Sequence, residues 1–282
     1  MNNRRKLLSN AISLALLACV AAVQAQSLKI GMTGSVPAGA SATVKVTPAA
    51  NGAEQIKRAI QLQRKIDEAQ LPQQKFAALT ETLANLKIIP KTWPNDTAAV
   101  VRGAMMQADI GAEFGLFPVI TDALLPVIPL VQKTAQEPDV ERRLGDAYER
   151  MGKYVEAEKH LVAAERSLTP KLMDCADANA VLTSVAMFYA RRNQPREAIK
   201  RLRRKAELPG QDVVNKMISQ LEILKQAVRL SDDPAYAVAR QELATFDDLL
   251  FRARGTTLSS QDARLVENMA NHAQRIKNQH RL

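Results

Sequence analysis

The sequence predicts an all-α protein, and three observations support this fold class. Aromatic residues make up only 4% of the 282 residues and there are only 11 glycines, whereas β-barrels and sandwiches use aromatic residues in strands and glycines in turns. From residue 53 onward, apolar residues recur at the spacing of helix faces. With 24% charged residues and two cysteines, the composition also excludes a collagen-like chain, a disulfide scaffold and a highly charged disordered chain.

Residues 1–25 have the pattern of a secretory signal peptide. Three basic residues at positions 4–6 precede a mostly apolar run at 7–23, and the small residues Val23 and Ala25 fit a signal-peptidase site. The apolar run is short for a membrane span, which needs about 20 residues. We therefore expect cleavage after Ala25 and export, with the mature chain in the periplasm.

The same segment allows a second interpretation. Residues 16–19 resemble a bacterial lipobox, which would make Cys19 the lipidated N-terminus and anchor the protein to a membrane surface. Both interpretations leave Cys175 as the single free cysteine of the mature chain, since Cys19 is either removed or lipidated, so no intrachain disulfide is expected. Cys175 is expected to be a small buried residue, with an intermolecular disulfide as the alternative.

Residues 26–52 are rich in Gly, Ala, Ser and Thr, and two short runs, 28–30 and 42–46, are compatible with β-strands. A flexible tether is equally compatible with this composition, because an isolated two-stranded hairpin is only marginally stable. The segment is therefore expected to be either a short extended element or a linker.

Residues 53–95 predict a pair of helices followed by a linker. The apolar residues of the first helix follow helical spacing, and Pro72 separates this helix from the second one. The linker at 90–96 contains the only tryptophan, Trp93. Beside a proline, this side chain is expected to anchor the loop.

A repeat occupies the middle of the chain. One copy consists of Leu144-Gly145-x-x-Tyr148 followed by Gly152, Tyr154, Ala157, Leu161, Ala164 and Pro170. The next copy keeps the internal spacings with Val185-Ala186-x-x-Tyr189, Asn193, Ala198 and Leu202. These residues resemble the tetratricopeptide repeat (TPR), and the resemblance implies antiparallel helix pairs stacked as a short TPR-like solenoid over residues 96–208.

A weaker copy precedes these two. Ile110-Gly111-x-x-Phe114 leads to Ala123 and Val127, and Ile110 lies 34 residues before Leu144, which is the repeat length of the family. Pro126 and Pro129 fall in the second helix of this copy, which must kink or end there. None of the three copies has the early tryptophan of the family.

Further helices are expected in residues 209–282, where they extend or cap the solenoid. The first covers residues 213–230. The second begins at Asp233-Pro234, because proline is favoured in the first turn, and ends at Gly255. A start signal at Ser259 opens the last helix, which runs to the C-terminus.

The TPR resemblance implies a groove lined by the stripe of each first helix that does not pack against its partner. In the middle copy this stripe carries charges of both signs, and in the next copy it is mostly uncharged. We call the following residues the binding stripe: Asp139, Arg142, Asp146, Glu149, Arg150, Thr183, Met187 and Arg191. Such a surface suits an extended peptide or a partner helix, and an ordinary solvated face is the alternative.

Residues 191–205, the basic segment, contain eight basic residues and one acid, Glu197. Their surplus of seven charges equals that of residues 26–282, because residues 1–25 contribute three of the formal charge of +10 of the whole chain. Helical spacing of the apolar residues places most of this charge outward. The candidate anion-binding residues are Arg192, Arg196, Lys200, Arg201, Arg203, Arg204 and Lys205. They would bind anionic lipid, polysaccharide such as lipopolysaccharide, or an acidic protein, and a solvated helix face is the alternative.

No motif for catalysis, a metal or a cofactor occurs in the sequence. The three histidines, His160, His272 and His280, form no metal-binding pattern and lie among residues that look solvated. There is no nucleophile elbow, phosphate loop or dinucleotide fingerprint. We therefore expect no catalytic residue, no metal and no cofactor, and nucleic acid is not an expected partner because no aromatic residues interleave the basic segment.

The expected function is a periplasmic protein–protein interaction scaffold in cell-envelope assembly or secretion. Its TPR-like groove would hold a peptide or helix of an envelope protein. Binding of an anionic envelope component by the basic segment is the alternative. A cell-wall-degrading enzyme is a lower alternative.

Overall fold

The computed structural model describes residues 44–169, 176–230, 232–233 and 235–282, and throughout these ranges the regular structure is helical, without a strand. The predicted all-α class is therefore confirmed for this part of the chain. The signal segment, residues 28–30, Cys19 and Cys175 lie outside the described residues. Residues 44–46 of the second candidate strand are described and do not form one. No described helix is long and apolar enough to cross a bilayer.

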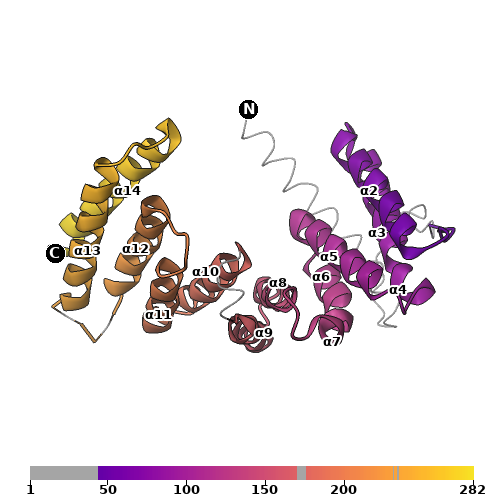
Figure 1. Ribbon diagram of the computed structural model, residues 1–282, viewed down its shortest axis with the longest axis horizontal. Coiled ribbons are helices and arrows are strands. Elements are labelled where there is room, and N and C mark those ends of the chain that lie inside the picture. Colours follow the sequence, from indigo (N-terminus) through magenta and orange to yellow (C-terminus); the bar gives the residue numbers. More distant parts are fainter. Residues whose placement is uncertain (1–43, 170–175, 231, 234) are drawn as a thin grey trace, which may run out of the picture. The chain divides into compact units, whose positions relative to one another are not determined.

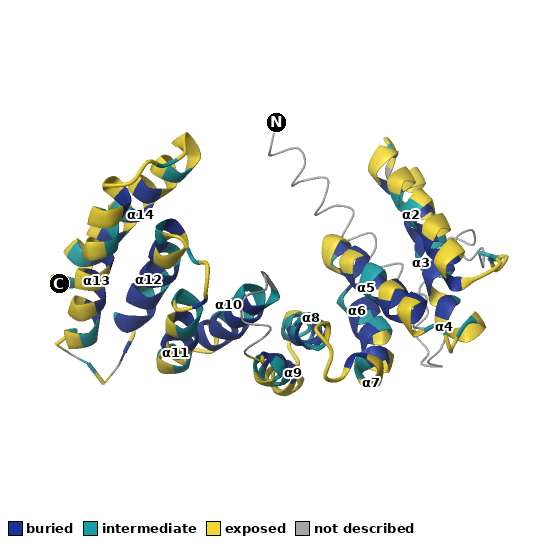
Figure 2. Cartoon of the chain, viewed as in Figure 1, coloured by how far each residue is buried: buried dark blue, intermediate teal, exposed yellow. Residues whose placement is uncertain are grey.

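The chain divides into two compact units, Met1–Gln132 and Lys133–Leu282. This boundary lies inside the range 96–208 that we predict for the repeats. Figure 1 shows the helices of each unit, and Figure 2 shows that buried residues gather where neighbouring helices face one another.

The first unit consists of two helix pairs with short connecting helices. The pairs are α2 with α3 and α5 with α6. Its elements are α2 (Gly52–Glu68), α3 (Pro72–Lys87), α4 (Ile89–Thr92), α5 (Thr97–Phe114), α6 (Phe117–Leu124), the 3-10 helix η1 (Leu125–Val127) and α7 (Ile128–Val131). Short polar residues start two of them: the side chains of Asn51 and Asp96 accept hydrogen bonds from the first turns of α2 and α5.

The prolines act in the first unit as predicted. Helix α6 ends at Leu124, and Pro126 and Pro129 each lie at the start of a new short element, η1 and α7. The apolar residues here still form core, since Leu124, Val127 and Val131 are buried. The kink therefore shortens the second helix of the weak repeat copy without breaking the packing.

The second unit contains α8 (Glu137–Arg150), α9 (Tyr154–Ser167), α10 (Ala176–Arg191), α11 (Pro195–Ala206), α12 (Val213–Ala227), α13 (Ala237–Arg254) and α14 (Ser260–His280). Each helix packs against the next one in the chain, and α8 also packs against α10 and α12 against α14. The first helices of the α8–α9 and α10–α11 pairs thus contact each other, as well as their own partners (Figure 1).

The pairs α8–α9 and α10–α11 have the same turn, 41 residues apart. Gly152 and Asn193 both have left-handed backbone, with φ of 75° and 57°. The N–H of Lys153 donates to the carbonyl of Tyr148 at 2.9 Å, and that of Gln194 to the carbonyl of Tyr189 at 2.9 Å. Such bonds satisfy carbonyl groups at the end of a helix. The 41-residue spacing of these two copies in the sequence is therefore also the spacing of two equivalent turns in the structure.

Gly145 marks the closest approach of α8 and α9. A Cβ atom at this position would lie 2.5 Å from Cγ of Leu161 and 3.1 Å from the carbonyl oxygen of Ala157. In the first unit, a Cβ on Gly111 would lie 2.6 Å from Cγ1 of Ile120, so α5 and α6 also meet at a glycine. However, α5 ends at Phe114, whereas α8 continues beyond Tyr148 to Arg150. The first helix of the weak copy thus has the same small-residue contact but ends two residues earlier relative to the motif.

The last helices follow the predicted signals with two corrections, the first being that α12 ends at Ala227 and not at residue 230. Gly255 ends α13, and the side chain of Ser259 accepts from the N–H of Asp262 at the start of α14, as expected. However, α13 begins at Ala237, not at Pro234, which lies outside the described residues. The two carboxylate oxygens of Asp233 accept from the N–H groups of Ala237 and Val238 at 2.9 and 2.8 Å, and this cap fixes the start of the helix.

Candidate partner-binding surface

The α8 part of the binding stripe is a network of ion pairs. Arg142 lies between Asp139 and Asp146, one turn away on either side, with its Nη2 2.5 Å from Asp139 Oδ1 and its Nη1 3.0 Å from Asp146 Oδ2. Arg143 also donates to Asp139, at 2.7 Å. The spacing of three and four residues puts these groups on neighbouring positions of one helix. The stripe is therefore charged with both signs, and its charges are held by one another.

Two contacts join this network to α10. The hydroxyl of Ser184 donates to Asp146 at 3.1 Å. Arg191 donates through Nε and Nη2 to the two carboxylate oxygens of Glu149, at 2.6 and 2.5 Å. A guanidinium paired with both oxygens of a carboxylate has a defined orientation. The stripes of the two predicted repeats are thus brought together into one surface across α8 and α10.

The two aspartates of the network have opposite electrostatic environments. Burial alone would raise the pKa of Asp139, but the charges and hydrogen bonds of Arg142 and Arg143 lower this pKa below its usual value. Arg142 and the hydroxyl of Ser184 lower the pKa of Asp146, but the effect of burial is larger, so this pKa is raised overall. For Arg191, the hydrogen bond to Glu149 raises the pKa against the effect of burial. The folded protein therefore favours the charged form of Asp139 and disfavours the charged form of Asp146.

The other residues of the stripe have different surroundings. Arg150 is exposed. The hydroxyl of Thr183 donates to the carbonyl of Asn179 in its own helix at 2.7 Å. Met187 is half-buried and packs against the apolar cluster that α12 shares with its neighbours. Sequence reasoning missed Arg143 and Ser184, which lie 41 residues apart, next to the stripe in each predicted repeat.

The basic segment differs from its expected outward orientation at Arg201. This side chain is buried, with its Nε 3.1 Å from Oε2 of Glu165 on α9, and it also binds Glu197 one turn earlier. The guanidinium lies over the ring of Tyr189, 4.6 Å from the centroid. A buried arginine requires such partners because an unpaired charge is costly away from water. Arg201 is therefore a packing residue of the interface between α9, α10 and α11.

Most other arginines of this segment also bind carboxylates from other parts of the unit. Arg196 binds Asp232, Arg203 binds Glu242 on α13, and Arg204 binds Glu165 on α9 at 3.1 Å. Lys200 is exposed. Burial lowers the pKa of Lys205, which is half-buried. The charge surplus that is concentrated in the sequence is therefore largely neutralised in space.

An aromatic ring and a basic side chain pair at the same position in both hairpins. Tyr148 stacks on His160 with centroids 5.3 Å apart, and 41 residues later Tyr189 lies under Arg201. His160 does not lie among solvated residues, as its sequence neighbours suggested, because it is buried with its Nδ1 2.6 Å from Oε2 of Glu141. This nitrogen–oxygen contact joins α8 to α9.

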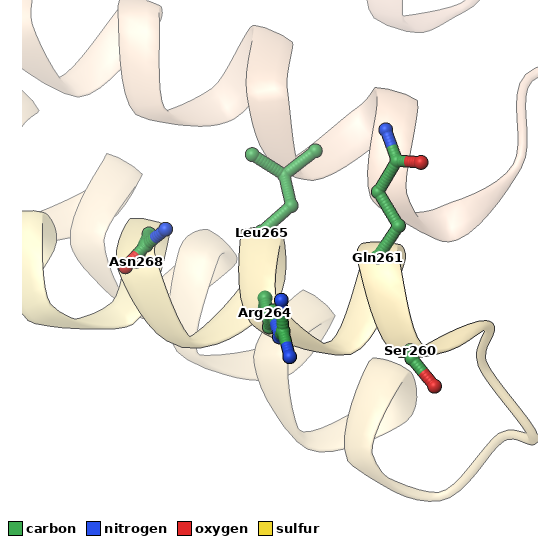
Figure 3. Close-up of a pocket in the computed structure, with 5 residues that line it drawn as sticks. All are labelled: Ser260, Gln261, Arg264, Leu265 and Asn268. Carbon is green, nitrogen blue, oxygen red and sulfur yellow. The ribbon is translucent and has the colours of Figure 1, made fainter. Parts of the chain in front are cut away.

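A pocket borders the N-terminal half of α14 and is lined by Ser260, Gln261, Arg264, Leu265 and Asn268 (Figure 3). Gln261 and Leu265 extend together to one side of the helix, while Ser260 and Arg264 point away from them. The polar groups therefore do not converge on one point, as a site for a small molecule requires. Within the described ranges, no three His, Cys, Asp or Glu side chains are placed to hold a metal ion.

No protein-family model matches the chain, and no curated protein matches it.

Proposed function

We propose that the protein is an exported binding scaffold of the TPR type, which holds a peptide or helix of a partner protein on the binding stripe. The observation that carries this proposal is the equivalence of the α8–α9 and α10–α11 hairpins, with the same turn hydrogen bonds 41 residues apart. Repeats of this kind present successive first helices side by side, and these helices provide an extended surface for a partner. Cell-envelope assembly or secretion is the proposed setting.

The chemistry of the stripe supports a polypeptide partner. Paired carboxylates and guanidinium groups offer acceptors and donors at fixed positions, and the half-buried Met187 adds an adaptable apolar contact. Since the charges are already paired, a partner would exchange or bridge these pairs instead of neutralising a bare charge. Such a surface favours specificity over raw affinity.

Anion binding by the basic segment has weaker support. Arg196, Arg201, Arg203 and Arg204 hold carboxylates of the protein itself. An anionic lipid or polysaccharide would have to compete with these carboxylates, which have a high effective concentration because they are part of the same chain.

The experiment is capture of envelope proteins by the purified mature chain, with the retained proteins identified by mass spectrometry. Arg142→Glu with Arg191→Glu reverses two charges of the stripe and should abolish capture of the specific partner. Arg252→Glu with Arg254→Glu is the matched control, since these arginines are exposed on α13 and also pair with acids. Equal capture by wild type and the stripe variant would contradict the proposal.

The mass of the mature N-terminus tests export, because cleavage after Ala25 and lipidation at Cys19 give different masses.

A further inference from the structure

An exposed group of apolar and cationic side chains surrounds the turn between α8 and α9. Tyr154 and Val155, the first two residues of α9, are 43% and 81% exposed. Arg150, Lys153 and Arg192 are exposed beside them. We call these five residues the Tyr154 patch.

Two cation–aromatic contacts orient basic side chains of the patch, and the ion pair of the neighbouring residues Glu149 and Arg191 lies next to it. The guanidinium of Arg192, just beyond the end of α10, lies 4.3 Å from the ring centroid of Tyr154. Lys153 Nζ lies 5.8 Å from the ring centroid of Tyr148 on α8. Arg150 directly follows Glu149, which binds Arg191, the residue before Arg192. Cations held over aromatic rings are oriented before any partner arrives.

The fold does not account for the apolar side chains. In the equivalent hairpin, 41 residues later, Tyr154 and Val155 are replaced by Pro195 and Arg196, and the same turn forms. The first turn of the second helix therefore needs neither an aromatic ring nor an aliphatic side chain. Exposed tyrosine next to arginine is, however, the composition of protein interfaces, where these residue types supply most of the binding energy.

The charge of the patch indicates the kind of segment that it would bind. Among the described residues, Arg150, Lys153 and Arg192 have no carboxylate in ion-pair contact, in contrast to Arg142 and Arg191 of the binding stripe. Two acids of α9 lie near the patch: Glu156 is on another side of the helix from Tyr154, and Glu158, one turn after Tyr154, accepts a hydrogen bond from the hydroxyl of Tyr189 at 2.9 Å. The three cations outnumber these two acids. A complementary segment is therefore acidic and carries an apolar side chain that covers Val155.

We propose that the Tyr154 patch is a docking surface for an acidic peptide segment with an aliphatic residue between its carboxylates. This inference rests on the proposed function, and it names the chemistry of one part of the partner. The patch begins where the binding stripe ends, at Arg150 and Arg191. The acidic segment would anchor a polypeptide whose continuation runs along the stripe.

The test uses the full mature chain and a fluorescein-labelled peptide of alternating Glu and Leu, about eight residues long. Matched peptides carry Gln in place of Glu, or Ser in place of Leu. Fluorescence anisotropy should give a Kd for the Glu-Leu peptide about tenfold lower than for either control peptide, and the affinity should fall as salt rises from about 0.05 to 0.3 M. Equal affinity for the three peptides, or no binding, would overturn the proposal.

Variants assign the binding to the patch. Val155→Asp and Lys153→Gln should each weaken binding of the Glu-Leu peptide about tenfold. Lys216→Gln is the matched control, because Lys216 is exposed on α12 outside the patch, and the affinity of this variant should equal that of wild type. If Val155→Asp lowers the thermal midpoint of unfolding, Val155→Ser replaces it. Wild-type affinity in the patch variants would overturn the assignment.

Two further experiments distinguish a separate peptide-binding patch from binding by the stripe and from a membrane contact. Arg142→Glu changes the binding stripe only, so it should lose partner capture and keep affinity for the Glu-Leu peptide. Loss of peptide binding by Arg142→Glu would contradict a separate patch. Vesicles of phosphatidylglycerol should bind no better than vesicles of phosphatidylcholine. Binding to the anionic vesicles that Val155→Asp abolishes, without binding of the peptide, would replace the proposal by a membrane contact.

Discussion

Arg191 near the end of α10 binds both carboxylate oxygens of Glu149 on α8, 42 positions earlier in the chain. The side chain of Glu149 is 10% exposed and that of Arg191 is 54% exposed, so the pair closes one edge of the contact between two successive hairpins. It also makes the stability of this contact and the shape of the proposed binding surface depend on the same two residues.

Removal of Arg191 should cost moderate stability. Water reaches this side chain, but its loss leaves Glu149, at 10% exposure, without its cation, so we expect Arg191→Ala to lower the free energy of unfolding by about 1–2 kcal/mol. Arg191→Glu should cost more, since it faces Glu149, and the exchanged double variant Glu149→Arg with Arg191→Glu should recover part of the loss. Urea unfolding followed by circular dichroism compares these three variants and the single variant Glu149→Arg. Additive effects of the two single changes would show that the side chains are not coupled.

Gly145 should not tolerate a side chain. Alanine normally stabilises a helix by about 1 kcal/mol relative to glycine, but here its Cβ would lie 2.5 Å from Leu161 Cγ. We expect Gly145→Ala to destabilise by about 1–3 kcal/mol because α8 and α9 must separate. Gly255→Ala is the control: its Cβ would have no atom closer than 3.4 Å, so the effect should stay within about 0.5 kcal/mol. A more stable Gly145→Ala variant would contradict the close approach.

Arg201 should be the most sensitive basic residue of α11. Its side chain is 10% exposed, and its loss leaves Glu165, at 15% exposure, with one fewer cation. We expect Arg201→Met to cost about 3 kcal/mol, as is typical when one partner of a buried ion pair is removed. Lys200→Met changes the exposed neighbour and should cost less than about 0.5 kcal/mol. Thermal unfolding compares the two variants, and equal midpoints would argue against the buried position of Arg201.

The aspartates of the stripe should give opposite pH dependence. The pKa of Asp139 is lowered by folding, so its contribution is complete above the unfolded value and is lost as pH falls through the folded pKa. Asp139→Asn should therefore destabilise at pH 7 and approach wild type as the pH falls through the lowered pKa of Asp139. The pKa of Asp146 is raised, so Asp146→Asn should be neutral or stabilising at pH 7, and this advantage should vanish in acid. Unfolding midpoints across this range test both signs.

Most helix boundaries could be predicted from local sequence signals. Pro126 and Pro129 ended the second helix of the weak copy because proline removes a backbone donor wherever it lies. Gly145 and Tyr148 predicted the α8–α9 pair, since both act on the adjacent helix. The start of α13 differed because two hydrogen bonds to Asp233 outweighed the general preference for proline in a first turn.

The charged contacts could be predicted only in part. Asp139, Arg142 and Asp146 lie one turn apart, so their pairing follows from helix geometry. The partners of Arg196 and Arg203 are 36 and 39 positions away, and helical periodicity carries no information on such contacts. His160 looked solvated for the same reason, because Glu141 is on another helix.

The neutralised basic segment has a practical consequence for work with fragments. A chain cut at Gly210 would lose Asp232 and Glu242, and Arg196 and Arg203 would then lie bare on its surface. Such a fragment should adhere to heparin, nucleic acids and acidic resins in a way that the intact protein does not. An affinity for polyanions measured on such a fragment would therefore reflect the arginines that truncation exposes, and not a property of the intact protein.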